Sequence, residues 1–220
     1  LGSNSETIIN GGTFGGIYTN GSQTNNCKLT INNGVFEEML YLAGSGTYKI
    51  ENGTFSDVTQ NAVIEIKRGT LEINGGTFTK NISSEGNKDA EVEGNGSGEY
   101  QGVILVTKKD GYEGNVSVAI NGGTYTNNLG DAIVMANESA TLESLITINK
   151  SNVQITGNIK NYIEKDNAKI EYGAVAQVGN NKYETFEEAL ENVANEGTIK
   201  LLGNVTIKEG KYLSDEVNKN

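Results

Sequence analysis

The residues best suited to bind a metal lie in an acidic, glycine-rich stretch at about residues 83–99. Asp89, Glu91 and Glu93 alternate there, and alternating carboxylates followed by glycine are typical of the first half of a calcium loop. The match is incomplete, because Glu stands where Asp or Asn is usual and Tyr100 stands where a bidentate Glu is needed. A solvated loop is therefore the favoured interpretation, and calcium binding by these three acids stays an alternative.

The residues best suited to catalysis are few and scattered. Arg68 is the sole arginine, and Glu65 and Lys67 lie close to it, so a base and a carboxylate would be available for acid–base cleavage. Asp131 is an isolated acid, and Cys27, the single cysteine, has no histidine in the chain to activate it. We interpret the charged residues as part of a solvated outer surface and Cys27 as a small packed or surface thiol. The sequence thus predicts no catalytic residue and no cofactor.

The charge balance bears on the class of partner. The chain has 28 acidic and 17 basic residues and a net charge of −11. Nucleic acids and anionic membrane surfaces favour basic patches, and no run approaches the roughly 20 apolar residues of a membrane span. We therefore predict neither nucleic-acid binding nor membrane insertion. Because the chain starts with Leu-Gly-Ser rather than Met, we expect it to continue into further domains of a longer protein.

One short phrase, Ile-Asn-Gly-Gly-Thr-Phe or a close variant, occurs five times. The fold that this repeat builds must position the residues described above. Each copy has an isoleucine anchor, a glycine three residues later and an aromatic residue five residues later. The anchors are Ile9, Ile31, Ile50, Ile73 and Ile120, and the aromatic residues are Phe14, Phe36, Phe55, Phe78 and Tyr125. The anchors are 22, 19, 23 and 47 residues apart, and the last step is about two periods or one period with an insertion. Repeats of this length indicate a solenoid.

Strand alternation explains the phrase physically. Residues two apart in a strand point to the same side, so Leu71 and Ile73 share an interior while Glu72 faces out. The Asn-Gly-Gly that follows turns the chain, since Asn and Gly tolerate positive φ, and Phe78 then returns to the interior. One unit cannot bury its apolar side alone, whereas stacked units pair as parallel strands and bury continuous ladders. The phrase is thus one corner of a repeated coil.

A second apolar run follows most copies of the phrase and predicts a second stacked sheet. These runs occupy residues 39–44, 62–69, 102–108 and 132–139, and residues 145–159 form a less regular sixth repeat. We therefore predict an all-β fold, a parallel β-helix of about five to six rungs over residues 1–170 with an insertion at about 83–99.

Alternation of side chains along the apolar runs of the second sheet predicts an exposed apolar surface. If Glu65 and Lys67 face solvent, aligning the four runs with one another places apolar residues on the outer side. The predicted patch consists of Leu40, Leu42, Val63, Val103, Leu105, Ile133 and Met135. An exposed apolar patch usually marks a contact, so these are the candidate partner-binding residues, with cover by the insertion or by the C-terminal helix as the alternative.

The Asn/Gly turn followed by Gly-Thr-Phe resembles the right-handed parallel β-helix repeats of large surface proteins from Gram-positive, clostridial-type bacteria. These repeats belong to the pectin-lyase-like superfold, and the resemblance covers about residues 5–160. The pattern departs at Val35 and Glu51, which a turn or solvent-facing position can absorb. The resemblance implies an extracellular, cell-surface location and an adhesive or structural role. Relatives within the superfold cleave polysaccharides, so a carbohydrate-binding or polysaccharide-cleaving domain is the alternative.

Residues 171–220 differ from the repeats and predict a small α+β module. Phe186, Ala189, Leu190 and Val193 have helical spacing, and Thr185 begins a capping box with Glu188. Gly197 is placed to end the helix, a hairpin is predicted before it and strands after it. The module either caps the preceding stack or begins another β-helix.

We thus expect a non-enzymatic adhesin or stalk domain, with a host glycan or matrix protein as the conceivable partner. A weaker indication of sugar binding comes from tyrosines at predicted turns and strand edges, where aromatic rings can stack on sugars. They are Tyr18, Tyr41, Tyr100, Tyr112 and Tyr162.

Overall fold

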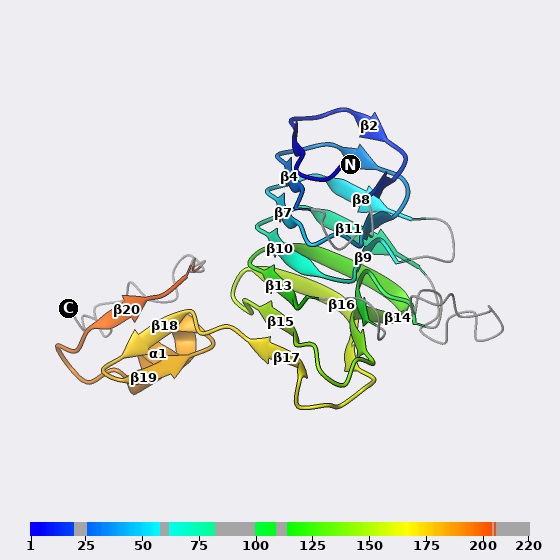
Figure 1. The fold of residues 1–220 in the computed structure, drawn as a ribbon. Helices are drawn as coiled ribbons and strands as arrows, with labels where there is room; N and C mark the ends of the chain where they lie inside the picture. Colours follow the sequence, from blue (N-terminus) through cyan, green and yellow to red (C-terminus); the bar gives the residue numbers. More distant parts are fainter. Residues whose placement is uncertain (20–25, 58–61, 82–99, 109–113, 204, 206–220) are drawn as a thin grey trace.

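A computed structural model describes residues 1–19, 26–57, 62–81, 100–108, 114–203 and 205. Within these residues most strands run parallel and stack into a β-helix with three faces (Figure 1). The first face is a seven-stranded sheet in the described part of the chain. It contains β1 (Glu6–Ile9), β4 (Lys28–Ile31), β7 (Thr47–Ile50), β10 (Gly69–Ile73), β13 (Val116–Ile120), β15 (Ser144–Ile148) and β17 (Ala168–Tyr172).

The second and third faces follow in each rung. The second face contains β2 (Thr13–Phe14), β5 (Val35–Phe36), β8 (Thr54–Ser56), β11 (Thr77–Lys80) and the first parts of β14 (Gly123–Asn137) and β16 (Val153–Asn161). The third face contains β3 (Ile17–Tyr18), β6 (Leu40–Leu42), β9 (Ile64–Ile66), β12 (Ile104–Lys108) and the remainders of β14 and β16. The long strand β14 passes from one face to the next and joins both into one hydrogen-bonded sheet.

The repeated phrase forms the corner between the first and second faces. The anchor isoleucine ends a first-face strand, and the aromatic residue lies in the next second-face strand, as β10 and β11 illustrate. Gly76 turns the chain with φ of +110°, and a Cβ there would approach the backbone oxygen of Gly53 to 3.1 Å. Because an L side chain rarely adopts this φ, the phrase requires glycine at this corner.

The core consists of ladders along the stack. Anchor isoleucines pair in register from rung to rung, as Ile31, Ile50 and Ile73 do. The aromatic residues stack face to face, with ring centroids 5.1, 4.8, 4.6 and 4.8 Å apart along the series Phe14, Phe36, Phe55, Phe78 and Tyr125. Centroid spacings close to the 4.7–4.9 Å between neighbouring strands let every ring contact its neighbours without distorting the backbone.

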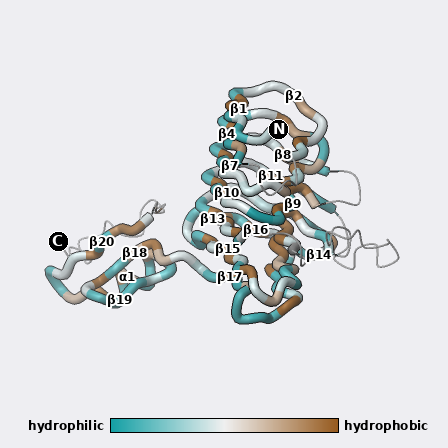
Figure 2. Tube along the Cα trace, in the orientation of Figure 1, coloured by the Kyte–Doolittle hydropathy of each residue, from teal (hydrophilic) through white to brown (hydrophobic). Residues whose placement is uncertain are grey.

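The structure confirms the predicted parallel β-helix. Six rungs are built from these strands in the described residues, and β17 begins a seventh. The less regular sixth repeat forms β15 and β16, as expected. Hydrophobic and hydrophilic residues alternate along the coils (Figure 2), and the aliphatic and aromatic side chains of the inner side make up the main core.

The C-terminal module forms its own small sheet. It contains β18 (Ala176–Val178), β19 (Asn181–Tyr183), α1 (Phe186–Asn192) and β20 (Ile199–Leu201), with strand order β19-β18-β20, and its core includes Val175, Ala176 and Ala189. The predicted capping box is present: the Thr185 hydroxyl accepts from the Glu188 amide, and the Glu188 carboxylate accepts from the Thr185 amide. The helix ends at Asn192, before the expected Gly197, because Val193 adopts an extended conformation.

A polar joint connects the module to the stack. Its sheet shares no hydrogen-bonded strand with the two long sheets in the described residues, and it lies beside the lower rungs in Figure 1. Lys150 of the stack lies 2.6 Å from the Glu184 carboxylate of the module and 3.7 Å from the centre of the Tyr172 ring. This ion pair is open to solvent, since the Lys150 and Glu184 side chains are about two-fifths exposed.

Candidate functional site

The outer side of the third face carries charged residues that are buried. Glu65 of β9 contacts Lys67 just beyond that strand, with 2.8 Å between the carboxylate oxygen and Nζ. Thr107 of β12 completes a triangle: its hydroxyl donates to Glu65 over 2.6 Å and accepts from Lys67 over 2.7 Å. The Lys67 side chain is 0% exposed and that of Glu65 is 4% exposed, so each charge depends on the other for compensation.

Neighbouring buried groups extend this polar region. Lys67 also lies 5.8 Å from the centre of the Tyr41 ring, and Nε of Arg68 donates to the backbone oxygen of Ala43 over 2.7 Å. On the adjoining corner, Lys80 Nζ lies 3.0 Å from the carboxylate of Asp57, and both side chains are almost fully enclosed. Thr107 of β12 links the Glu65–Lys67 pair to the next rung, and the Lys80–Asp57 pair joins two consecutive rungs directly. A substrate could not reach these groups, so the arrangement supports a structural role rather than acid–base chemistry.

The expectation that Glu65, Lys67 and Arg68 are solvated is therefore wrong. Sequence alternation correctly placed Glu65 on the outer side of β9, but it carries no information on what else covers that side. Of the two alternatives for Cys27, a packed or a surface thiol, the structure has the packed one: Cys27 is fully buried, with its thiol 3.9 Å from the Tyr48 hydroxyl. Burial raises the pKa of Tyr48 above its usual value, so this phenol stays protonated and donates to the backbone oxygen of Gly44.

The predicted apolar contact patch is also wrong. All seven residues are buried, each at most 1% exposed: Leu40, Leu42, Val63, Val103, Leu105, Ile133 and Met135. Strand alternation places Leu40, Leu42, Ile133 and Met135 on the inner side. Val63 and Val103 lie at the corner just before β9 and β12 and also join the main core, so six of the seven lie inside. The exception, Leu105, does lie on the outer side, but it is enclosed in a small cluster with Val134 against Tyr100.

A different group of residues lies at the surface near the lower end of the third face. Asp131 of β14 sits at an irregularity in the pairing with β16, where the register shifts on both sides of it. One of its carboxylate oxygens accepts from the side-chain amide of Asn158 over 3.0 Å, and the other accepts from the Tyr162 hydroxyl. Tyr162 is 37% exposed and contacts Tyr100, with ring centroids 4.7 Å apart. These residues combine an aromatic surface with polar groups.

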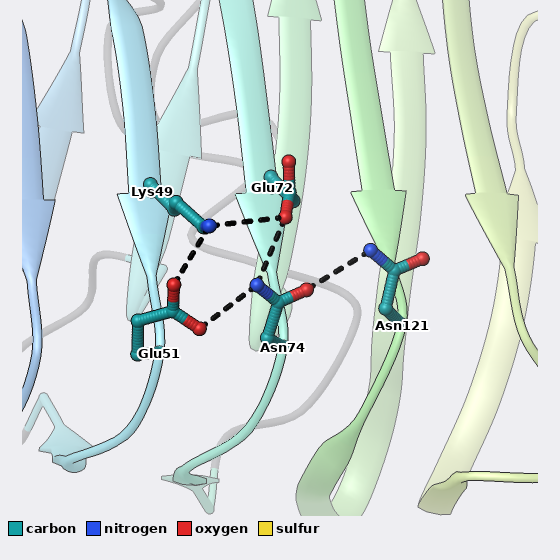
Figure 3. Close-up of polar contacts among 5 residues, drawn as sticks. All are labelled: Lys49, Glu51, Glu72, Asn74 and Asn121. Carbon is teal, nitrogen blue, oxygen red and sulfur yellow. Dashed lines mark hydrogen bonds and ion pairs between the residues drawn. The ribbon is translucent and has the colours of Figure 1, made fainter. Parts of the chain in front are cut away.

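A second exposed polar arrangement lies at the first corner (Figure 3). Lys49 Nζ lies 2.7 Å from Glu51 and 3.7 Å from Glu72, and the Asn74 side-chain amide donates to both carboxylates. Asn121 continues the ladder by donating to Asn74 over 3.0 Å. Hydrogen bonds from Lys49 and Asn74 lower the pKa of Glu51. The hydrogen bond with Glu51 in turn raises the pKa of Lys49. Since these side chains are well exposed, the ladder fixes register more than it adds stability.

The calcium candidates Asp89, Glu91 and Glu93 lie outside the described residues. In the part of the chain that the structure describes, no group of three or more His, Cys, Asp or Glu side chains is arranged to hold a metal ion. No helix among the described residues is long and apolar enough to cross a membrane.

Comparison with known proteins identifies no relative. No family model matches the chain, and neither the curated proteins nor the solved structures contain a match. The class of protein is therefore defined here by its fold, a parallel β-helix with a small α+β module.

Proposed function

We propose that this chain is a non-enzymatic structural module, a rigid spacer within an extracellular surface protein of a bacterium. The observation that carries the proposal is the unbroken register of the first face. Strands of consecutive rungs pair residue by residue along the first face, and the aromatic ladder runs beside them. Such a stack adds length in fixed increments and resists bending, because each rung is bonded to both neighbours.

A spacer is favoured over an adhesin because the residues expected to form the adhesive patch lie inside the protein. It is favoured over a polysaccharide-cleaving enzyme because the Glu65–Lys67 and Asp57–Lys80 pairs are enclosed and neutralise each other. The cell-surface location and bacterial origin rest on the resemblance of the repeated phrase to surface-protein repeats.

The experiment that tests the spacer is the insertion of extra rungs. Residues 28–46 form one unit, since Lys28 pairs in register with Thr47 of the next rung. Three additional copies placed after Gly46 should lengthen the particle by about 14 Å, at 4.7–4.9 Å per strand, in small-angle X-ray scattering. The matched control inserts a Gly/Ser segment of equal length, which should add no stacked rung.

Two results would argue against the spacer. One is an insertion variant that loses cooperative unfolding, because a modular stack should accept a repeated unit. The other is release of new reducing or unsaturated ends from a polysaccharide by the unmodified protein, which would establish an enzyme instead.

A further inference from the structure

We propose that the group around Tyr162 is a carbohydrate-binding site that takes one ring of a neutral polysaccharide. Sugar rings have an apolar C–H face and a polar hydroxyl edge. A matching protein surface therefore needs an exposed aromatic ring and, beside it, hydrogen-bonding groups held in place. Asn158 of β16 and Tyr162, which directly follows the end of that strand, provide these two features, and Asp131 holds both.

The pairing irregularity between β14 and β16 creates this arrangement. At Asp131 the register shifts relative to Asn158, and such irregularities re-aim side chains that regular pairing would direct elsewhere. The Asn127 side chain donates to the Asp131 backbone oxygen over 2.9 Å and fixes the local geometry. Gly157, with φ of +110°, lets β16 approach closely, since a Cβ there would lie 2.7 Å from the backbone oxygen of Gly130. The register shift, the Asn127 hydrogen bond and the close approach at Gly157 together fix the backbone around Asp131.

Asp131 acts as a positioning residue. It is 2% exposed, so it cannot contact a ligand over any substantial area. Its two oxygens instead accept from Tyr162 and from Asn158, and so fix the ring and the amide relative to each other. Side chains fixed before binding lose less conformational entropy when a ligand arrives.

The two surface residues contribute complementary contacts. Tyr162 is 37% exposed, and its ring contacts that of Tyr100 with centroids 4.7 Å apart. Asn158 uses its amide nitrogen to reach Asp131, which leaves its carbonyl oxygen, on an exposed residue, to accept from a sugar hydroxyl. Lys160, also exposed, lies between them in sequence and adds a donor. A neutral sugar fits better than an acidic one, because the protein as a whole carries a charge of −11.

The test uses the whole chain and four defined probes: cellohexaose, xylohexaose, mannohexaose and N-acetylchitohexaose. We expect saturable binding of at least one probe by isothermal titration calorimetry. Tyr162→Ala should weaken that binding about tenfold or more, as loss of an aromatic contact surface would. Tyr162→Phe, which keeps the ring and loses the hydroxyl anchor, should weaken it less, and Asn158→Ala should also weaken it.

Tyr172→Ala is the matched control, because Tyr172 is 39% exposed, lies on the first face and contacts Lys150 rather than Asp131. It should bind the probe as the unmodified protein does. The proposal is overturned if no probe binds at about 10 mM, a concentration that would detect even weak specific sites. It is equally overturned if Tyr162→Ala binds normally, or if Tyr172→Ala loses as much affinity as Tyr162→Ala.

Discussion

The aromatic ladder gives the most quantitative prediction. Phe78 is fully buried and stacks on Phe55 at 4.6 Å and on Tyr125 at 4.8 Å. Truncating a buried Phe to Ala costs about 3–5 kcal/mol, and the loss of two ring contacts of about 0.5–1.5 kcal/mol each favours the upper end of that range. We therefore expect Phe78→Ala to lower the free energy of unfolding by about 4–5 kcal/mol.

Two variants test whether stacking within the ladder is the cause. Phe14 is only partly buried and has one neighbouring ring among the described residues, Phe36 at 5.1 Å, so Phe14→Ala should cost about 1–2 kcal/mol. Phe78→Tyr should cost less than about 1 kcal/mol. The reason is that Tyr125, in the same ladder position, satisfies its hydroxyl by donating to the backbone oxygen of Gly122 over 2.8 Å.

The assay is urea unfolding followed by far-ultraviolet circular dichroism, with tyrosine fluorescence as a second probe of the same transition. Agreement between both probes would justify a two-state analysis. The reasoning is refuted if Phe14→Ala and Phe78→Ala destabilise the protein equally, or if Phe78→Ala costs less than about 2 kcal/mol, well below a buried-ring loss.

Three further predictions concern the corners and the charged residues. Gly122→Ala should lower the melting temperature strongly, because the new Cβ would lie 2.3 Å from a backbone oxygen of a neighbouring rung, whereas Gly11→Ala, with nothing within 4 Å, should not. Lys67→Met should cost about 3–5 kcal/mol in urea unfolding by removing the Lys67 charge that faces the buried Glu65 carboxylate; a loss below 1 kcal/mol would contradict this. Glu51→Asn should change stability by less than about 0.5 kcal/mol at pH 7. Because the Glu51 pKa is lowered in the folded state, its contribution exists above the ordinary carboxyl pKa and is lost as pH falls. Any advantage over the Asn variant should therefore shrink in melting curves between pH 7 and 3, and an advantage that grows would refute the assignment.

The fold could be predicted because single positions of the repeat each require a particular type of residue. A glycine at φ of +110° and an aromatic residue two positions later identify the first corner, and Gly76 and Phe78 occupy those places. The capping box of α1 was predictable for the same reason, since Thr185 and Glu188 act locally. Local rules of this kind need no knowledge of the rest of the molecule.

The candidate surface could not be predicted from sequence. It depends on the register of each strand and on which other residues cover its outer side. A shift of one residue moves a side chain to the opposite side of a strand, which is why Leu40 and Ile133 lie inside. The Tyr162 group arises from a pairing irregularity at Asp131, and nothing in the local sequence marks it beyond an isolated acid and a tyrosine at a strand edge. Sequence did draw attention to both residues separately, but only the fold brings them into contact.

The three corners of the coil differ in how much chain they accept. In the first four rungs the first corner always takes three residues, as between Ile73 and Thr77, whereas the second corner takes two residues after Phe14 and 23 between Lys80 and Ile104. Doubling the length of a flexible connection costs only about 0.6 kcal/mol, so the stack can tolerate such variation wherever no glycine turn is required. The second corner is thus a natural point for grafting foreign peptides. A coil built this way can accept new segments at this corner, in evolution or by engineering, while the ladders that hold it together stay unchanged.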